Sequence, residues 1–159
     1  MIELKNFIKL TLDEKFMILD WRNDLNTRKW MYASDMIEKV DHLKYIEYLK
    51  NSIHKKYFLV FKENIAIGVI YFTDIDYNEK SCEFGLYRNL GVEGVGNILM
   101  DKIIDYAFGE LKLNRIVAEV FNNNIKAIDL YKKKGFSIYD QNFKKNKKIT
   151  YMELKHECR

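Results

Sequence analysis

The chain has 159 residues, of which 48% are apolar and 31% charged, with a net charge of +4, a composition typical of soluble globular proteins. This length predicts a single domain over residues 1–159, and no apolar run reaches the roughly 20 residues that a membrane span needs. Charged residues interrupt the N-terminal stretch where a secretory signal has an unbroken apolar core, so we expect a cytoplasmic protein.

The first third of the chain predicts a strand followed by two helices. Residues 1–10 alternate enough to form an opening strand. The T-x-x-E pattern at 11–14 predicts a capping box in front of a helix over 14–23. Apolar residues recur at helical spacing over 40–53, behind Asp41 as a candidate N-cap, and predict an amphipathic helix.

The middle of the chain predicts three strands and a helix. Residues 57–75 are rich in β-branched and aromatic side chains and predict two strands joined as a hairpin at 63–64. Residues 81–89 predict a further strand. A helix is expected over 94–108, with an apolar stripe formed by Val95, Ile98, Leu99, Ile103 and Ala107.

The last third predicts a strand, a helix and two closing strands. The strand covers 115–121, and the helix over 125–135 ends at Gly135 as its C-cap. Residues 136–143 and 147–155 predict two strands around a lysine-rich turn. The order β-α-α-β-β-β-α-β-α-β-β, without repeats or a linker, predicts an α+β domain with a mixed sheet and helices on both faces.

The lysines and cysteines limit the kinds of ligand and partner that we expect. The last quarter concentrates lysines that either face an anionic group or form an ordinary solvated surface. Nucleic acid is not expected, because the cluster has little arginine and no nucleic-acid module surrounds it. Cys82 and Cys158 lack the spacing of a disulfide framework or a zinc site, so we expect plain thiols and no metal. The clustered lysines are Lys132, Lys133, Lys134, Lys144, Lys145, Lys147 and Lys148.

Three glycines stand where the strand at 81–89 passes into the helix at 94–108. Gly91, Gly94 and Gly96 lie in the stretch GLYRNLGVEGVG. A glycine-lined helix start exposes backbone N–H groups and the positive end of the helix dipole, which suits a phosphate. The spacing matches neither the P-loop nor the dinucleotide fingerprint. The loop alone therefore indicates either an anion site or a tight turn.

Two motifs in this order resemble the GNAT superfamily of acetyl-CoA-dependent N-acetyltransferases. The family's pyrophosphate loop, Q/R-x-x-G-x-G/A, is matched at 91–96, except that Gly91 replaces the usual Gln or Arg. The later N-x-x-A-x-x-L-Y-x-x-x-G-F motif is matched over 124–136. The resemblance implies the GNAT fold: a mixed, mostly antiparallel central sheet splayed between its fourth and fifth strands, with acetyl-CoA in the gap.

The resemblance also implies which residues contact acetyl-CoA. The edge of the strand at 81–89 pairs with the pantetheine arm, and backbone N–H groups from Val92 to Asn97 hold the pyrophosphate. Gly94 and Gly96 are expected to be small so that phosphate oxygens reach the backbone. Arg88 or a lysine can replace the missing Gln or Arg. The expected cofactor contacts are Leu86, Tyr87, Arg88, Gly91, Val92, Glu93, Gly94, Val95, Gly96, Asn97, Asn124, Ala127, Tyr131 and Lys134.

Acetyl transfer needs an acid, a base and a donor to the carbonyl oxygen. Tyr131 is the candidate acid for the leaving thiolate, against the alternative of a core tyrosine. Glu119 is the first candidate base and would act through a water. Half-burial is expected to raise the pKa of its carboxyl group, and the alternative is an outward-facing strand residue. Glu83 is the reserve base, ahead of His42 and His54. A backbone N–H of the strand, near Leu86 or Tyr87, is expected to polarise the carbonyl.

The acceptor side resembles the branch with ribosomal-protein N-terminal acetyltransferases and nucleotide-sugar amine acetyltransferases. Within it, the chain is most similar to the bacterial enzymes of the pseudaminic-acid pathway, which acetylate a UDP-linked amino-dideoxy sugar for flagellin glycosylation. The resemblance implies small-molecule partners and leaves a homodimer open. Protein N-termini, polyamines and a non-catalytic acyl-CoA-binding role stay as alternatives. The candidate acceptor residues are Trp21, Arg22, Asn23, Arg28 and His42.

Overall fold

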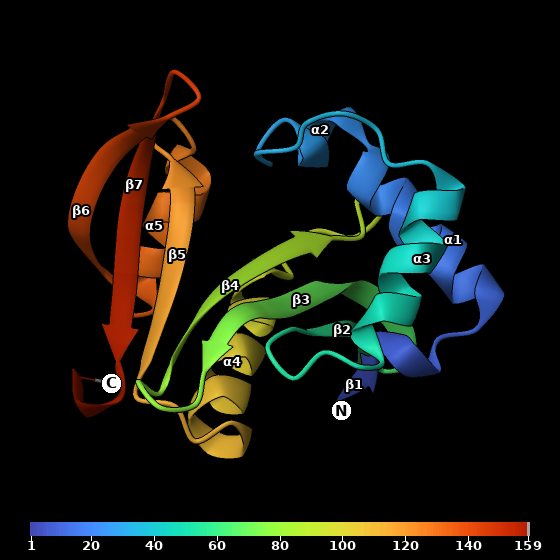
Figure 1. The fold of residues 1–159 in the computed structure, drawn as a ribbon, viewed down its shortest axis with the longest axis horizontal. Coiled ribbons are helices and arrows are strands. Elements are labelled where there is room, and N and C mark those ends of the chain that lie inside the picture. Colours follow the sequence, from blue (N-terminus) through green and yellow to red (C-terminus); the bar gives the residue numbers. More distant parts are fainter. Residues whose placement is uncertain (159) are drawn as a thin grey trace.

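A computed structural model describes residues 1–158 and shows a seven-stranded sheet with helices on both faces (Figure 1). The strand order is β1-β2-β3-β4-β5-β7-β6, and only β4 and β5 run parallel. This confirms the predicted α+β fold with a mixed, mostly antiparallel sheet. The elements are β1 Ile2–Asn6, α1 Leu12–Asn23, α2 Leu25–Arg28, α3 Lys39–Leu49, β2 Lys56–Lys62, β3 Ile65–Asp76, β4 Ser81–Arg88, α4 Gly96–Asp105, β5 Arg115–Phe121, α5 Ile125–Lys133, β6 Ser137–Lys144 and β7 Lys147–Lys155.

The sheet separates two apolar cores. One core lies under α4 and α5 and takes Val60 from β2, whereas the other lies under α1 and α3 and takes the preceding Leu59. Neighbouring strand residues divide in this way because successive side chains point to opposite faces. The stripe predicted for α4 is confirmed, since Leu99 and Ile103 are fully buried in the first core. Burying each such side chain contributes about 1.5–3 kcal/mol.

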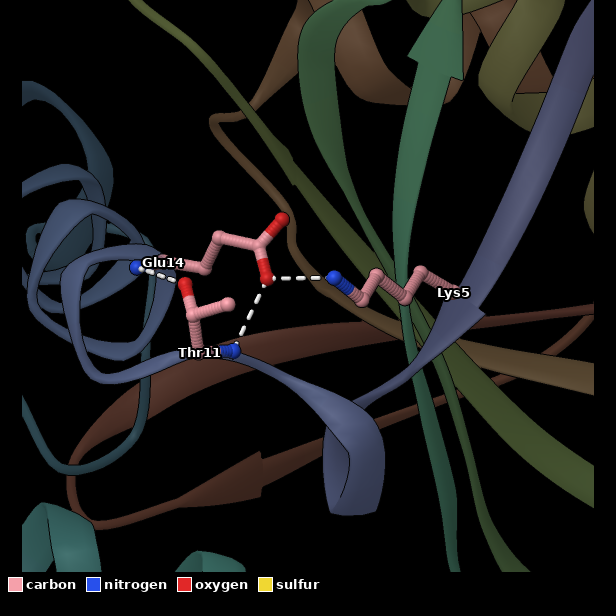
Figure 2. Close-up of polar contacts among 3 residues, drawn as sticks. All are labelled: Lys5, Thr11 and Glu14. Atoms are coloured by element: carbon pink, nitrogen blue, oxygen red, sulfur yellow. Dashed lines mark hydrogen bonds and ion pairs between the residues drawn. The ribbon is translucent and has the colours of Figure 1, made fainter.

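The predicted capping box is present at the start of α1 (Figure 2). Thr11 Oγ1 accepts the N–H of Glu14 at 3.2 Å, and Glu14 Oε1 accepts the N–H of Thr11 at 2.9 Å. Glu14 also forms an ion pair with Lys5 Nζ of β1 at 2.7 Å. These contacts satisfy free donors of the first helical turn and join the start of α1 to the sheet.

We expect the Thr11→Ala substitution to lower the free energy of unfolding by about 1 kcal/mol, because it removes the oxygen that caps α1. Urea denaturation followed by circular dichroism measures this change. Thr11→Ser is the matched control and keeps wild-type stability, because serine caps helices as well as threonine does. Equal stability of the alanine and serine variants would contradict the assigned role of the cap.

Several elements differ from the sequence prediction. The opening strand ends at Asn6, whose Oδ1 accepts the N–H of Ile8 at 3.1 Å and turns the chain into a 3₁₀ turn, η1 (Phe7–Lys9). Asp41 is not the cap of α3, which begins after Glu38 and has no side-chain cap. The short helix α2 was not predicted; a single helical turn leaves too little periodicity to recognise.

Positive backbone angles confirm both predicted hairpins and the end of α5. Glu63 and Asn64 have φ values of 49° and 69°, and Lys145 and Asn146 have 50° and 64°. Two successive positive values are typical of the tight turn that joins antiparallel strands. Gly135 has φ of 96° and follows Lys134, the C-cap of α5, so the expected glycine ends the helix one position beyond the cap.

The sheet opens between β4 and β5, as predicted. Pairing between these strands covers only Ser81–Glu83 against Arg115–Val117. Beyond these residues the two strands diverge toward their C-terminal ends (Figure 1). The unpaired part of β4 still pairs with β3 on its other side, up to Arg88 opposite Gly68. The result is a V-shaped gap whose closed end lies at Glu83.

Two remaining observations concern the thiols and the membrane. Cys82 is a buried free thiol, and burial raises its pKa to about 12, so it is unreactive at neutral pH. The side chain of Cys158 lies outside the part that the structure describes. Within residues 1–158, no helix has the length and apolar character to cross a bilayer.

Candidate active site

Helix α4 begins at the glycine-rich loop with its backbone donors unused. Among residues 1–158, the backbone N–H groups of residues 93–98 have no hydrogen-bond acceptor, and Val95 at the N-cap supplies no side-chain cap. The first turn contains no acidic side chain. The helix dipole adds its positive end to this row of donors, so the start of α4 suits an anion such as a pyrophosphate.

Glycine occupies positions 94 and 96 of the loop for two different physical reasons. Gly94 has φ of 72°, a left-handed conformation that glycine adopts without strain, and a Cβ there would meet nothing within 4 Å. A Cβ on Gly96 would lie 3.1 Å from Leu130 of α5. The small size of Gly96 thus also allows α4 to approach Leu130 of α5, and the expectation that it admits phosphate stays a prediction.

Hydrogen bonds within the loop use some of the groups expected to bind phosphate. The N–H of Gly91 donates to Asn89 Oδ1 at 2.9 Å, and the N–H of Val92 donates to the Asn89 carbonyl at 3.1 Å. Arg88 Nη1 donates to the Val92 carbonyl at 2.5 Å. These bonds correct the expectation for Val92, whose N–H is not free. The side chain of Arg88 therefore stabilises the conformation of the loop.

The open edge of β4 presents backbone groups to the gap. The N–H of Asn89 donates to the Ile67 carbonyl of β3 at 2.9 Å. Because backbone groups alternate in direction along a strand, those of Tyr87 also face β3, and those of Leu86 and Arg88 face the gap. Leu86 and Arg88 are thus placed to pair with the amides of a pantetheine arm. Of the two candidate oxyanion donors, only Leu86 directs its N–H into the gap.

Tyr131 of α5 lies in the core beneath the gap. Its ring contacts Phe84 of β4 edge-to-face at 5.5 Å and Phe136 at 5.9 Å. Within residues 1–158 its hydroxyl makes no hydrogen bond. Burial raises the pKa of Tyr131 above its ordinary value, with a smaller effect from Tyr71, so the phenol stays protonated at neutral pH. The hydroxyl is a fixed donor without a protein acceptor.

The remaining motif residues organise the ends of α5. Asn124 is the N-cap, and its Oδ1 accepts the N–H of Ala127 at 3.3 Å. Lys134 forms an ion pair with Asp101 of α4 at 2.8 Å. A contact between Lys134 and acetyl-CoA would therefore compete with this ion pair, whereas the amide nitrogen of Asn124 remains available to a ligand.

Two carboxyl groups meet at the closed end of the gap, on the face opposite Tyr131. Glu83 is the last residue of β4 that pairs with β5, and its partner there is Val117. Glu119 lies two residues further along β5. The two side chains lie close enough to form a hydrogen bond when one of them carries a proton. Glu119 Oε1 also accepts hydrogen bonds from Tyr32 at 3.0 Å and from Lys144 at 2.6 Å.

The pKa values of the two glutamates are shifted in opposite directions. Burial raises the pKa of Glu83 to about 7, and the hydrogen bond to Glu119 and its negative charge add to the effect. Burial also acts to raise the pKa of Glu119, but hydrogen bonds from Lys144, Glu83 and Tyr32 outweigh it, so the pKa lies below its ordinary value. The expected raised pKa for Glu119 is wrong. Glu83 is the group that titrates near neutral pH.

Near the closed end of the gap, the side chain of Tyr71 packs in the space that a side chain at Gly85 would need. A Cβ at this position would run into the ring of Tyr71 on β3. Tyr71 is stacked on Tyr57 with ring centres 4.8 Å apart, and it packs against Tyr87 at 6.4 Å. Gly85 therefore allows this tyrosine cluster to lie flat against β4.

We expect the Gly85→Ala substitution to destabilise the protein by about 1–3 kcal/mol, because it overpacks the site that Tyr71 fills. Thermal denaturation measures the loss. Gly109→Ala is the matched control, since a Cβ there meets nothing within 4 Å. Equal melting temperatures for the two variants would show that Tyr71 moves aside freely.

The candidate acceptor residues of α1 and α2 support the loop that follows them. Asn23 Nδ2 donates to the Ile37 carbonyl at 2.9 Å, and Asn23 Oδ1 accepts the Ile37 N–H at 2.7 Å. Arg28 donates to the carbonyls of Asn23 and Ser34 at 3.0 Å each. Trp21 is buried in the core under α1 and α3. Asn23 and Arg28 thus hold the loop that follows α2.

Arg22 differs from its neighbours because one of its guanidinium nitrogens has no hydrogen-bond acceptor among residues 1–158. Its Nη2 donates to the Ala33 carbonyl at 3.1 Å, whereas Nη1 is buried without a hydrogen-bond acceptor among residues 1–158. The guanidinium is close enough to lower the pKa values of Tyr71 and Tyr87 against the effect of their burial. A buried unpaired guanidinium donor is costly, and a bound anionic group would satisfy it.

The histidines are engaged elsewhere. His42 is buried, and its Nε2 lies 2.8 Å from the Lys15 carbonyl of α1. Burial lowers its pKa. His54 Nδ1 lies 2.8 Å from the Ile75 carbonyl at the end of β3. Both rings contact backbone carbonyls, so neither is placed as a free base.

Sequence reasoning missed Tyr32 and assigned Lys144 only to a lysine cluster. Both side chains reach Glu119, from positions 87 residues before it and 25 residues after it. Neither position belongs to a motif, and tyrosine and lysine are common types here. The one available signal was that the lysine-rich turn closes a hairpin beside β5. The cluster does not act as a unit, because Lys134 pairs with Asp101 instead.

The arrangement combines the elements of an acyl transfer. A row of N–H donors and an open strand edge can hold a phosphate-bearing, amide-containing arm along the gap. A protonated phenol lies on one face of the gap, and a carboxyl pair lies on the other. Among residues 1–158, no cluster of three or more His, Cys, Asp or Glu side chains could hold a metal ion.

Comparisons with known proteins agree with this geometry. The family model described as acetyltransferase (GNAT) domain matches residues 14–152. The acetyltransferase PseH of Campylobacter jejuni strain 81-176 is 45% identical over 141 residues, which cover 89% of this chain and 88% of the relative.

Solved structures show the same likeness. The crystal structure of Campylobacter jejuni N-acetyltransferase PseH in complex with acetyl coenzyme A has a TM-score of 0.82 at 40% identity, covering 98% of this chain and 99% of that chain. The spermidine N-acetyltransferase of Vibrio cholerae, solved with CoA and spermine, has a TM-score of 0.87, covering 99% of this chain and 96% of that one. Its 21% identity shows a shared fold alone.

Proposed function

Because the chain belongs to the GNAT acetyltransferase family and is therefore an acetyl-CoA-dependent N-acetyltransferase, we propose that it acetylates the 4-amino group of a UDP-linked amino-dideoxy sugar. This acceptor belongs to the pseudaminic-acid pathway for flagellin glycosylation, and the reaction takes place in the cytoplasm. The observation that carries the proposal is the parting of β4 from β5 directly after Glu83, with the carboxyl pair on one face and Tyr131 on the other.

Acetyl-CoA enters along the gap. The N–H groups at the start of α4 bind its pyrophosphate, and the gap-facing backbone groups of Leu86 and Arg88 pair with its pantetheine amides. The thioester carbonyl then lies beside β4, where the N–H of Leu86 stabilises the negative charge that develops on its oxygen. These contacts place the thioester between Tyr131 and Glu83.

The chemical step is a direct transfer. Glu83, as a carboxylate, takes a proton from the acceptor amine, and the amine nitrogen attacks the thioester carbon. The C–N bond forms, the C–S bond breaks, and the thiolate takes the proton of Tyr131. The proton on Glu83 then returns to the tyrosinate through solvent, so the net change moves one proton from the amine to the thiol of CoA.

An anionic acceptor is favoured by the charges on the acceptor side. Arg22 has a buried nitrogen without an acceptor, which suits a diphosphate and repels a polyamine. The 45% identity to PseH of Campylobacter jejuni supports the same class of acceptor. A spermidine-type acceptor is supported less well, by likenesses at 27% identity over 103 residues and at 21% identity in structure.

Release of free CoA thiol tests the proposal. The protein is incubated with acetyl-CoA and, in separate reactions, the UDP-linked 4-amino sugar, spermidine or a peptide with a free N-terminus. We expect rapid release with the sugar alone and a single added acetyl group in the product by mass spectrometry. Release with the peptide or spermidine, and none with the sugar, would overturn the proposed acceptor.

A further inference from the structure

Lys144 connects the C-terminal hairpin to the carboxyl pair. It is the last residue of β6, and its ammonium forms an ion pair with Glu119 Oε1 at 2.6 Å. The same ammonium lies over the ring of Tyr32 at 5.5 Å and over the ring of Tyr151 at 5.8 Å. Two aromatic faces and one carboxylate therefore fix the position of a side chain that would otherwise be free in solvent.

Several groups form hydrogen bonds with Glu119. Tyr32 and Lys144 both donate to Oε1 of Glu119, and Glu83 is its third hydrogen-bonding partner. Among residues 1–158, Glu119 thus receives an ammonium, a phenol and its partner carboxyl, whereas Glu83 receives only its partner carboxyl. A carboxylate with three donors is the stabilised anion of such a pair.

The other titratable groups around the pair do not provide this asymmetry. Asp74 on β3 is a further negative charge that disfavours ionisation of Glu83. Cys82 and Tyr71, beside Glu83, are neutral at physiological pH because burial raises their pKa values. Tyr151 on β7 contacts Lys144 and acts on Tyr32 rather than on Glu83. Lys144 is the cation that acts on both members of the pair.

We propose that Lys144 is a positioning residue of the acetyl transfer, whose ammonium keeps Glu119 as a carboxylate and thereby leaves the shared proton on Glu83. The proposal rests on the assignment of Glu83 as the base. Lys144 does not touch the reacting atoms. It decides which glutamate carries the proton, and its positive charge makes removal of that proton possible near neutral pH.

Removing the charge of Lys144 therefore has a defined direction. In Lys144→Met the pair must lose its last proton without a neighbouring cation, so the pKa of that step rises by about one pH unit. Because Glu83 acts as a base only when ionised, the acidic limb of the pH–rate profile moves to higher pH by the same amount. Activity on that limb falls about tenfold and recovers at alkaline pH.

Two measurements on the full chain test the proposal. Carbon-13 NMR of the glutamate carboxyl groups follows the titration of the pair without any substrate, and Glu83→Gln identifies the signal by removing it. The pH–rate profile is then recorded with acetyl-CoA and the amine that the wild type accepts. Lys148→Met is the matched control, since Lys148 lies on the same hairpin and contacts neither glutamate. Lys144→Arg keeps the charge and is expected to restore the wild-type titration.

The outcomes are distinct. A titration midpoint that rises in Lys144→Met, and stays in place in Lys148→Met and Lys144→Arg, supports the proposal. An unchanged midpoint in Lys144→Met overturns it, and so does a raised midpoint without any shift of the acidic limb. Failure of the UDP-sugar as acceptor would overturn the proposed function alone, because the NMR titration needs no acceptor.

Discussion

The Glu83→Gln variant is expected to lose about 10²–10⁴-fold in kcat/KM at pH 8, because it removes the group that takes the proton from the attacking amine. Burial and the neighbouring Glu119 raise the pKa of Glu83 to about 7. The wild-type profile should therefore rise through pH 7, and this limb should disappear in Glu83→Gln. Steady-state rates of thiol release between pH 5.5 and pH 9 measure both effects. A limb that persists in the variant reports the acceptor amine instead.

Glu119→Gln is the comparison that decides between the two carboxyl groups. Removal of the negative charge beside Glu83 lowers the pKa of Glu83, so the acidic limb moves to lower pH and the rate at pH 8 stays within about tenfold of the wild type. If Glu119 were the base, the two variants would exchange their behaviour. The experiment is thus informative for either assignment.

Stability measurements separate lost chemistry from lost folding in Glu83→Gln. A carboxyl group whose pKa is raised in the folded protein stabilises it fully below its ordinary value of 4.5, and this contribution is lost as the pH rises through about 7. Glutamine has no charge to bury, so the variant should melt at a higher temperature than the wild type at pH 8 and show no such gain at pH 5. An inactive variant that is also less stable at pH 8 would point to misfolding.

The parts of the site that lie close together in the sequence were predictable. Local sequence patterns predict the strand, the glycine loop and the helix over 81–108. Tyr131 belongs to a motif that begins at Asn124. The gap between β4 and β5 followed from the resemblance and is confirmed by the pairing of only three residues of each strand. The strand, the loop and the helix depend on local backbone chemistry, which the sequence displays directly, whereas the gap depends on pairing between residues that are distant in the chain.

The division of labour between the glutamates was not predictable in the same way. Whether Glu83 or Glu119 titrates near pH 7 depends on an ammonium and a phenol that arrive from distant segments. No spacing rule connects Tyr32 or Lys144 with Glu119. Likewise, the side chain that a Cβ on Gly96 would meet at 3.1 Å belongs to Leu130 on another helix. Tertiary neighbours set both properties, so sequence reasoning expected a raised pKa for Glu119, where the structure lowers it.

The Tyr131→Phe variant is expected to lower kcat by about 10²-fold while acetyl-CoA binds with unchanged affinity, because the substitution removes only the proton donor for the thiolate. The aromatic ring keeps its contacts with Phe84 and Phe136. The hydroxyl has no hydrogen-bond partner within residues 1–158, so its loss breaks no internal bond and the melting temperature should not fall. Isothermal calorimetry with CoA and steady-state kinetics measure the two quantities separately.

A change of leaving group tests the role of Tyr131 more directly than the rate alone. The selenoester analogue of acetyl-CoA releases a selenolate, which is less basic than a thiolate and needs less protonation as it departs. If Tyr131 donates the proton, the rate difference between wild type and Tyr131→Phe should shrink strongly with this analogue. An equal loss with both acyl donors would mean that Tyr131 positions the acetyl group rather than protonating sulfur. Tyr87→Phe is the control, because the backbone of Tyr87 faces β3 and its ring is buried in the other core.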